Sequence, residues 1–439
     1  MIKIFNTADL DFAQKFQCLC DRGKLDITGV REKVQVLLDD VSSRGLEAVL
    51  EHIARFDGYN PLTFDDICIS PNACQNAYEN LPENIKSALH TAYERIYAFH
   101  AKQKPKTWLD FEENGTILGQ KVSPVERAGL YIPGGKAVYP SSLLMNAIPA
   151  IVAGVREIVV CTPTPANKPS DILLATAHLC GIKEIYKVGG ASAIGLMAYG
   201  IGNIGIDGKD GVKKVDVITG PGNIFVATAK KLVFGDVGID MIAGPSEIGI
   251  IADENANPKY IAHDLLSQAE HDEMASAILL TPSPHIAEQT LVYLQEILSG
   301  LGRENIAKKS LMQRGAMIIA KDIEECIALS NALAFEHLEI LVQNPFELLP
   351  KITHAGAIFL GENSPEPIGD YLAGPNHTLP TGGSARFFSP LGTEHFMKKS
   401  SIISFSKQAI LELGNDCAHL AALEGLDAHQ KAILARTKE

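Results

Sequence analysis

The sequence predicts an α/β protein with two Rossmann-like domains, each built on a parallel sheet, and small helical extensions at both ends. Two observations lead to this prediction. Between residues 129 and 239, a short apolar segment, a loop rich in Gly or Pro and a helical pattern follow one another four times. A second series of apolar segments and helical patterns covers residues 248–360. Short apolar strands that alternate with helices are typical of parallel sheets buried on both faces.

The composition is that of a globular protein with more than one core. A chain of 439 residues exceeds most single domains, and 46% hydrophobic with 21% charged residues is an ordinary globular balance. The net charge of -13, without any Lys/Arg block, argues against a nucleic-acid or anionic-membrane partner. The longest apolar run, residues 143–160, contains Pro149, Arg156 and Glu157, so it does not predict a membrane span.

The cysteines and the N-terminus point to the cytoplasm. The first residues lack the apolar region of a secretory signal, and none of the 8 cysteines forms a C-x-x-C pair. Several follow apolar residues, as Cys161 does after Ile158-Val159-Val160. Free thiols that are buried as small hydrophobic side chains suit a reducing compartment. We therefore expect a cytoplasmic protein.

The first hundred residues are predicted to be mostly helical. We expect a helical arm at residues 1–28, a helical segment at 30–56 that breaks near Gly45, and a long helix at 82–102. A β-hairpin follows, because Asn114-Gly115 is a strong signal for a tight hairpin turn.

The order of the elements suggests a discontinuous domain arrangement. We assign residues 29–128 and 240–380 to the first α/β domain and residues 129–239 to the second. Residues 381–439 are expected to form a helical tail. A tail of this length is too short to bury a core of its own, so it must pack against another part of the protein. We expect it to dock on a partner subunit.

In the second domain, glycine-rich loops follow the apolar strands. Ligands of open parallel sheets bind beyond the carboxyl ends of the strands, where these loops lie. Residues 220–223, Gly-Pro-Gly-Asn, open a helix and can bring backbone N–H groups to a phosphate. Residues 200–205 match G-x-G-x-x-G, but they follow a helix and run into a turn-rich loop. The dinucleotide fingerprint needs the opposite context, so we reject this match and predict sheets that lack the usual fingerprint.

In the first domain, Gln268 and His271 stand at the predicted end of a helix. Asn257 resembles the N-cap of that helix and Pro258 its first residue. Gln268 and His271 are three residues apart and therefore share a face. Imidazole is a common zinc ligand, and a second donor one turn away can help to hold a metal. The alternative is a polar, solvated helix end.

Four further sites carry side chains capable of chemistry. Glu336-His337 lies at a helix-to-strand junction, where an adjacent acid and imidazole can share proton transfers, unless both are simply exposed loop residues. Asp370 and His377 lie in the loop 361–383, which is rich in Gly and Pro, and long loops of this kind are often functional. Ser246 either binds a ligand or caps a turn. His429 lies near the start of the last helix, where a surface histidine is the simpler interpretation.

Together these segments resemble the histidinol dehydrogenase family over nearly the whole chain. The matching stretches occur in the family's order and are Gly129-Leu130-Tyr131-Ile132-Pro133-Gly134-Gly135, Val188-Gly189-Gly190-Ala191, Gly220-Pro221-Gly222-Asn223, Ala243-Gly244-Pro245-Ser246-Glu247, residues 264–271, Glu336-His337-Leu338-Glu339, Gly369-Asp370-Tyr371, Pro375-Asn376-His377 and Glu424-Gly425-Leu426-Asp427-Ala428-His429. So many ordered matches make the resemblance very specific.

The resemblance implies an activity and a set of site residues. The family oxidises L-histidinol twice, through the aldehyde, to L-histidine, the last steps of histidine biosynthesis, with NAD and zinc. It implies one zinc ion held by Gln268, His271, Asp370 and His429. It implies Glu336 and His337 as proton-transfer residues, and it implies that substrate is held by Ser246, His337, Glu424 and the zinc ligands. It implies NAD contacts from Tyr131, Asn223 and the position of Ser192. The family forms homodimers in which the C-terminal tail completes the partner's site.

Three departures from the family pattern concern mainly the cofactor. Ser192 stands where the family usually has Gln, at a position that contacts NAD. Phe335 stands where the family usually has Pro, directly before the Glu-His pair. Extra residues lie between Gly200 and Val212. We therefore expect the details of NAD binding, rather than the chemistry, to differ.

Two other functions remain possible from the residues alone. One is a zinc hydrolase, because zinc, Glu and His also build hydrolytic sites. The glycine-rich strand ends and the absence of H-E-x-x-H argue against it. The other is a dehydrogenase-like binding protein without turnover, which only Ser192 suggests.

Overall fold

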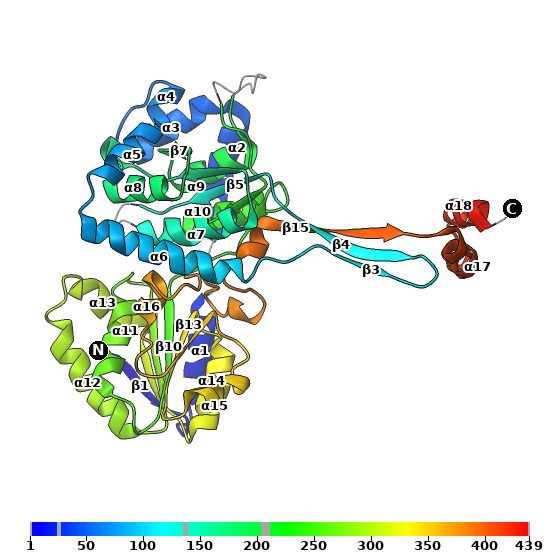
Figure 1. Cartoon of the computed structure of the whole chain (residues 1–439). Helices are drawn as coiled ribbons and strands as arrows, with labels where there is room; N and C mark the ends of the chain where they lie inside the picture. Colours follow the sequence, from blue (N-terminus) through cyan, green and yellow to red (C-terminus); the bar gives the residue numbers. More distant parts are fainter. Residues whose placement is uncertain (1, 24–27, 135–138, 203–210, 438–439) are drawn as a thin grey trace. The chain divides into compact units, whose positions relative to one another are not determined.

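The computed structural model describes residues 2–23, 28–134, 139–202 and 211–437. These residues form two compact units, one of residues 1–103 and 126–396 and one of residues 104–125 and 397–439. The larger unit contains two six-stranded sheets, and all of their strand pairs but one are parallel (Figure 1). The predicted fold class is therefore confirmed. None of the described helices has the length and hydropathy that a membrane span requires.

The first sheet is wholly parallel and is covered by helices on both faces. Its strands, in spatial order, are β1 (Lys3–Asn6), β12 (Ala316–Ile319), β11 (Ser276–Thr281), β10 (Glu247–Ala252), β13 (His337–Leu341) and β14 (Ala357–Leu360). The accompanying helices are α1 (Phe12–Cys20), α11 (Pro258–Ala269), α12 (Pro284–Leu298), α13 (Glu304–Arg314), α14 (Ile323–Leu333), α15 (Pro345–Leu348) and α16 (Glu366–Tyr371). Ile250 packs in the cluster with α11 and α12, whereas Ile251 packs in the cluster with α14. Both faces of β10 are therefore buried.

The second sheet is parallel except for one short edge strand. Its strands, in spatial order, are β2 (Cys68–Ile69), β7 (Glu184–Tyr186), β6 (Glu157–Cys161), β5 (Arg127–Tyr131), β8 (Val217–Thr219) and β9 (Gly238–Ile239). Its helices are α2 (Thr28–Arg44), α3 (Leu46–Phe56), α4 (Phe64–Ile67), α5 (Pro71–Glu79), α6 (Glu83–Ala101), α7 (Pro140–Ala153), α8 (Asp171–Leu179), α9 (Gly190–Tyr199) and α10 (Ile224–Val233). Gly45, with φ 58°, separates α2 from α3, as expected.

The first hundred residues differ from the predicted domain boundaries. Helices α2 and α3 pack in one cluster with α9 and α10, and β2 pairs antiparallel with β7. These residues therefore belong with the second sheet and not with the sheet formed after residue 240. The two-residue strand β2 is too short to leave a sequence pattern. The predicted N-terminal arm differs as well, because it begins with strand β1, which pairs with β12.

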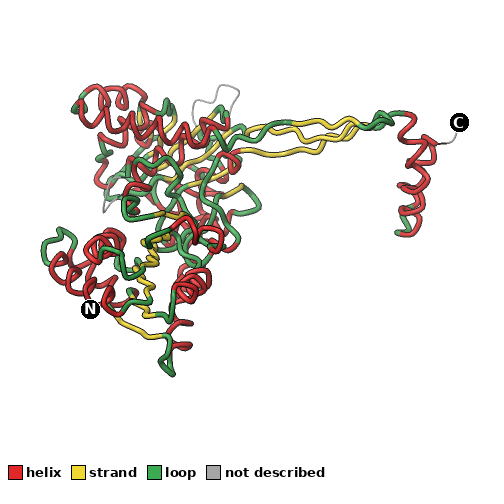
Figure 2. Tube along the Cα trace, turned by 60° about the horizontal axis from the view of Figure 1, so that its bottom comes forward, coloured by secondary structure: helices red, strands yellow, loops and turns green. Residues whose placement is uncertain are grey.

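The smaller unit is a three-stranded antiparallel sheet with two helices. Strands β15 (Met397–Ser404), β4 (Ile117–Pro124) and β3 (Trp108–Phe111) lie in that order, and α17 (Lys407–Leu423) and α18 (Asp427–Thr437) follow. Figure 2 shows these strands in yellow and the helices in red. The hairpin turn at Gly115, with φ 81°, is as predicted. The tail is not wholly helical, because β15 pairs with β4 over 8 residues. The sequence of β15 is polar and therefore does not show the apolar pattern that predicts a strand.

Candidate active site

The acid–imidazole pair lies at the amino-terminal edge of the first sheet. Strands β10 and β13 are parallel neighbours, and Ile248 is in register with His337. Glu336 and His337 therefore lie beside Ser246 and Glu247, where both strands begin. This is the opposite edge from the one at which open parallel sheets usually bind ligands.

The main chain of one residue, Glu247, orients both members of the pair. The Glu247 N–H donates to Glu336 Oε2 over 2.7 Å, and the Glu247 carbonyl is 3.0 Å from His337 Nδ1. A carbonyl only accepts, so Nδ1 carries the proton and donates it. In the neutral ring, Nε2 is then left with its lone pair. That Nε2 atom is buried and has no hydrogen-bond partner among the described residues, and whenever the ring is neutral it can accept a proton.

The electrostatics of the pair come from burial and from the neighbouring carboxyl groups. His337 Nε2 lies 3.6 Å from Asp370 Oδ1 and 3.9 Å from Glu366 Oε1. Burial raises the pKa of Glu336 to about 8, although the neighbouring His337 opposes this shift. Burial lowers the pKa of His337, but the negative charges of Glu336, Asp370 and Glu366 outweigh it and raise this pKa to about 10. A cation bound at Asp370 would weaken this effect and lower the pKa of His337.

Ligand-type side chains gather directly beside His337. One ligand atom each from His271, Glu366 and Asp370 lies within 4.8 Å of the others. Gln268 is fully buried, and its Nε2 is 3.4 Å from His271 Nδ1. The helix α11 ends at Ala269, so His271 lies just beyond it rather than within it as predicted. The structure thus brings together three of the four residues implied as zinc ligands, with Glu366 in addition.

Buried acceptors without partners mark this cluster as a place for a cation. Gln268 Oε1, Glu366 Oε1 and Glu339 Oε2 are buried without a hydrogen-bond partner among the described residues. Buried polar atoms in folded proteins are nearly always satisfied, so these acceptors fit a bound cation. The C-terminal end of α11 adds the negative end of a helix dipole, which also favours a cation.

Glu366 is a site residue that the sequence did not reveal. Residues 361–383 are predicted as a loop, in which the spacing of Glu366 and Asp370 has no meaning. In the structure both lie on α16, four residues apart and therefore on one face of the helix. Burial and the neighbouring Asp370 raise the pKa of Glu366 to about 7.

Neighbouring polar groups hold α16 in place. Glu339 Oε1 accepts the Glu366 N–H over 2.7 Å, and Ser267 Oγ donates to Glu366 Oε2 over 3.1 Å. Burial raises the pKa of Asp264, which interacts with Glu339, to about 6. His377 Nδ1 is 3.1 Å from the Asp370 carbonyl, so His377 helps to orient α16. These contacts support the position of Asp370.

The remaining implied substrate residues are distributed over both units. Ser246 is half-buried and directly precedes Glu247, and its carbonyl accepts the Ser276 N–H over 3.0 Å. Glu424 caps the C-terminus of α17, and His429 lies on α18. Both are exposed in the smaller unit. Their roles stay predictions.

The expected cofactor residues lie at the carboxyl edge of the second sheet. Tyr131 ends β5, and its hydroxyl accepts the Gly190 N–H at the start of α9 over 3.2 Å. Asn223 is exposed and caps α10, because its Oδ1 accepts the N–H groups of Phe225 and Val226. The amides of Phe225 and Val226 are thus already satisfied by Asn223. Residue 135 and half of the rejected G-x-G-x-x-G match, residues 203–205, lie outside the described residues, as do residues 203–210 of the extra segment.

A buried ion pair supports the Gly220 loop beneath this edge. The Gly220 N–H donates to Asp240 Oδ2 over 2.9 Å, and Lys230 Nζ donates to the Gly220 carbonyl over 3.0 Å. Lys230 and Asp240 also pair with each other, and both are buried. Gly220 has φ 117°, and a Cβ atom there would lie 2.0 Å from the Tyr131 carbonyl oxygen, so only glycine fits.

Ser192, which is expected to contact NAD, bonds to a neighbouring helix in the structure, and its role at the cofactor stays a prediction. It is 3% exposed, and its Oγ is 2.8 Å from His52 Nδ1. His52 Nε2 in turn lies 3.0 Å from Asp40 Oδ2. The hydroxyl of Ser192 therefore faces α3. Ser192 is the third residue of α9, and its short side chain lies in the packed contact between α9 and α3. There it bonds to the buried imidazole of His52.

Phe335 packs in the hydrophobic core of the first sheet, directly before the Glu336–His337 pair. It is fully buried, and a Cβ atom on Gly249 would lie only 2.2 Å from its ring, so the absence of a side chain on Gly249 makes room for it. The Phe335 carbonyl accepts the Gly356 N–H over 2.9 Å. The departure from the family pattern at this position is thus accommodated without breaking the junction that holds Glu336.

Two mostly parallel sheets and a buried acid–imidazole pair beside a cluster of ligand-type side chains are features typical of an α/β enzyme. Residues 20–437 match the family model for histidinol dehydrogenase. The chain is 62% identical over 435 residues to the histidinol dehydrogenase of Wolinella succinogenes, with 99% of each chain covered. It is 63% identical over 426 residues to that of Helicobacter hepaticus, with 97% of this chain and 96% of the relative covered.

A solved structure agrees with this assignment. The histidinol dehydrogenase of Elizabethkingia anophelis superposes with a TM-score of 0.91 at 36% identity, covering 100% of this chain and 98% of that one. This chain belongs to the histidinol dehydrogenase family. The resemblance found in the sequence is confirmed.

Proposed function

We propose that this protein oxidises L-histidinol to L-histidine in two NAD-dependent steps at a zinc-containing site. The observation that carries the proposal is the buried Glu336–His337 pair, with a free Nε2, directly beside the cluster of His271, Glu366 and Asp370. Family membership supplies the substrate class. The 8 free cysteines are consistent with a reducing, cytoplasmic setting.

The donor set fits zinc. Gln268 and Asp370 offer oxygen ligands and His271 offers a nitrogen, which are ligand types that zinc accepts. We propose His429 of the partner subunit as the fourth ligand, with Glu424 of the partner subunit on the substrate amine. The metal supplies a template that fixes the imidazole and amine of the amino alcohol. Glu366 lies in the same cluster as His271 and Asp370, so it is close enough to bind the substrate or the metal.

The chain's own groups account for the proton movements. In the first step, His337 Nε2 takes the hydroxyl proton while the carbinol carbon transfers hydride to NAD, which gives the aldehyde. In the second step, Glu336 takes one proton from a water whose oxygen adds to the aldehyde carbon, which gives the anion of the hydrate. This anion transfers a hydride to a second NAD, and the resulting carboxylic acid releases its proton to give the carboxylate. The hydrogen bond from Nδ1 to the Glu247 carbonyl keeps the imidazole in the orientation that this requires.

The cofactor is proposed to lie at the carboxyl edge of the second sheet. Tyr131, the first turn of α9 and Asn223 lie there, and the amides of a helix N-terminus suit a pyrophosphate. Ser192 contributes no direct contact in this proposal, because its hydroxyl bonds to His52.

Metal removal tests the proposal. The purified protein, with L-histidinol and NAD, should produce NADH and histidine, lose activity on chelation and regain it with zinc. Full activity in a preparation shown to be metal-free would contradict the zinc assignment. A zinc hydrolase would release product without NADH, and a binding protein would bind NAD without turnover.

A further inference from the structure

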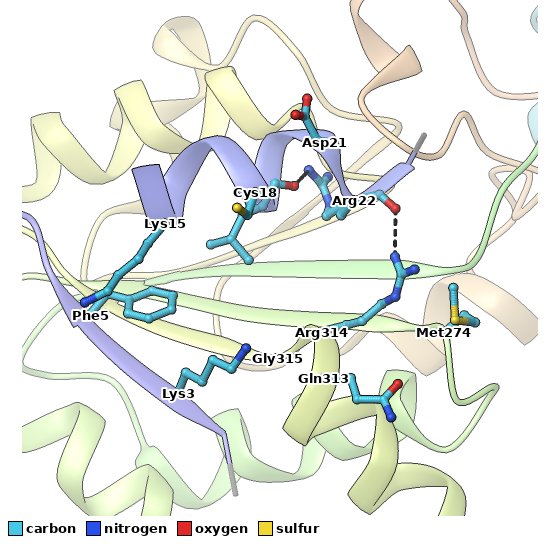
Figure 3. Close-up of a pocket in the computed structure, with 11 residues that line it drawn as sticks. Lys3, Phe5, Lys15, Cys18, Asp21, Arg22, Met274, Gln313, Arg314 and Gly315 are labelled. Atoms are coloured by element: carbon cyan, nitrogen blue, oxygen red, sulfur yellow. Dashed lines mark hydrogen bonds between the residues drawn. The ribbon is translucent and has the colours of Figure 1, made fainter. Parts of the chain in front are cut away.

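A cavity of about 540 Å³ lies away from the catalytic pair, beside the N-terminal segment of the larger unit. Its lining comes from β1, α1, the end of α13 and the turn before β11 (Figure 3). The residues that line it are Lys3, Phe5, Lys15, Cys18, Leu19, Asp21, Arg22, Met274, Gln313, Arg314 and Gly315. Its size lies within the range of about 300–1,000 Å³ that is usual for small-molecule sites.

The charged side chains of this lining are mostly cationic. Lys3 is exposed and has no carboxylate partner among the described residues. Arg314 donates one hydrogen bond, from Nη1 to the Arg22 carbonyl over 2.7 Å, and it too lacks a carboxylate partner in the described chain. Both side chains are therefore free to bind an anion. This surplus of positive charge occurs in a protein with a net charge of -13.

The other charged residues of the lining have partners of different strength. Lys15 Nζ pairs with Asp11 Oδ1 at 2.8 Å and lies 5.3 Å from the centre of the Phe5 ring. Both members of this pair are exposed, so it is weak and can yield to a stronger anion. Asp21, the one carboxylate of the lining, accepts from Gln17 Nε2 over 3.1 Å, and Figure 3 shows it directed away from Lys3 and Arg314.

Arg22 separates this cavity from the proposed active site. Its side chain is 4% exposed, and its Nη2 lies 2.7 Å from Glu247 Oε2. The same guanidinium donates to the carbonyls of Leu19 and Leu333. Because Arg22 is committed to these buried partners, an anion in the cavity would contact Lys3, Lys15 and Arg314 instead.

We propose that this cavity binds a small organic phosphate. The phosphate contacts Lys3, Lys15 and Arg314, and the fork of an arginine matches a phosphate with two parallel hydrogen bonds. The organic part lies against Phe5, Leu19 and Met274, the apolar part of the lining. A cavity lined by one sign of charge also concentrates ligands of the opposite sign.

Cys18 offers a direct reporter, because it is exposed and lines the cavity. Its alkylation by the neutral reagent N-ethylmaleimide is followed by mass spectrometry, with pyrophosphate as the probe. Cys417, exposed on α17, is the internal reference. We expect pyrophosphate to slow alkylation of Cys18 at least threefold and saturably, with Cys417 unchanged. Potassium chloride at equal ionic strength should have no such effect, which separates binding from screening.

Three variants locate the effect. Lys3→Gln and Arg314→Gln should each abolish most of the protection, whereas Lys308→Gln, an exposed position elsewhere on α13, should retain it. Lys3 makes no hydrogen bond that its loss could break within the described residues, so its variant tests the charge alone. An unchanged Cys18 rate, protection that chloride reproduces, or protection that survives both substitutions would overturn the proposal. The measurement needs neither L-histidinol nor NAD, so its failure leaves the proposed oxidation untouched.

Discussion

At the residue scale, the arrangement around Glu247 explains how a strand start can hold a catalytic pair. The main-chain N–H of Glu247 binds Glu336, and its main-chain carbonyl binds His337. The Glu247 side chain is itself fixed by Arg22 and by the Gly382 N–H, at 2.7 and 3.0 Å. Removing one partner of such a buried pair is costly, because the other charge is left without compensation. We therefore expect that loss of Arg22 would destabilise the site.

Glu336 and His337 are expected to divide the two half-reactions. Glu336→Gln should slow oxidation of the aldehyde more than oxidation of the alcohol, because only the aldehyde needs activated water. His337→Asn should slow both, by about 10²- to 10⁴-fold, the usual range for a general base. Rates of NADH formation from L-histidinol and from L-histidinaldehyde would be compared. If Glu336→Gln slowed the alcohol step alone, the assignment would be reversed.

Ser192 belongs to the packing between helices, and its substitution should show this. Ser192→Gln, which restores the usual family residue, forces a longer side chain against His52. We expect a loss of about 1–3 kcal/mol in the free energy of unfolding, the usual cost of overpacking. Urea unfolding measures it, with Ser43→Gln on the exposed face of α2 as the control. Tighter NAD binding at unchanged stability would show instead that residue 192 reaches the cofactor.

At the element scale, the contact between β10 and the start of β13 is unusually close. A Cβ atom on Gly249 would lie 2.2–2.6 Å from three atoms of the Phe335 ring. The bulk of Phe335 and the absence of a side chain on Gly249 are thus complementary. This contact packs the two strands that carry the site against each other.

The pair of substitutions Gly249→Ala and Phe335→Ala tests this contact. Gly249→Ala alone should cost about 1–3 kcal/mol through overpacking, and Phe335→Ala alone about 3–5 kcal/mol through the cavity it leaves. The double variant should cost clearly less than the sum, because the methyl group enters that cavity. Gly302→Ala, where a Cβ atom has no neighbour within 4 Å, is the matched control. Additive costs in chemical denaturation would contradict the predicted coupling.

The same scale shows what could be predicted from the sequence and what could not. Long, strongly patterned segments such as 82–102, and the four strand–loop–helix repeats, were predictable because burial alone imposes their periodicity. Strand β2 has two residues and β15 is polar, so tertiary pairing alone creates them. Glu366 was missed because α16 is a six-residue helix in a Gly- and Pro-rich segment. The family resemblance supplied the ligand set, whereas the spacing of residues alone did not.

At the scale of the whole molecule, the proposed chemistry and the proposed cofactor binding lie at edges of two different sheets in the larger unit. Proton-transfer and ligand residues lie at the amino edge of the first sheet, and the expected cofactor residues lie at the carboxyl edge of the second. Glu424 and His429 belong to the smaller unit. A complete set of implied zinc ligands therefore draws on both units, which motivates the proposal of a site shared between chains.

Mixed dimers test the shared site. Consider one chain with His337→Ala and one with His429→Ala, each of which should be nearly inactive as a homodimer. In a mixed dimer with shared sites, one site collects both defects and the other has none. Activity should then recover to at most about half that of the wild type per dimer, as two-fold symmetry requires. No recovery in dimers isolated with two different tags would place His429 in its own chain's site.

The pairing of β15 with β4 has a consequence for truncation and proteolysis. The 8 paired residues cover the whole of β4, and in the described part of the chain the shorter β3 is its one other strand partner. A cut before residue 397 would leave one edge of β4 with unpaired N–H and C=O groups. Exposed strand edges of this kind recruit strands from other molecules, so such a fragment should aggregate. Protein that loses its C-terminal segment during purification should then precipitate and should not remain as an inactive, soluble core.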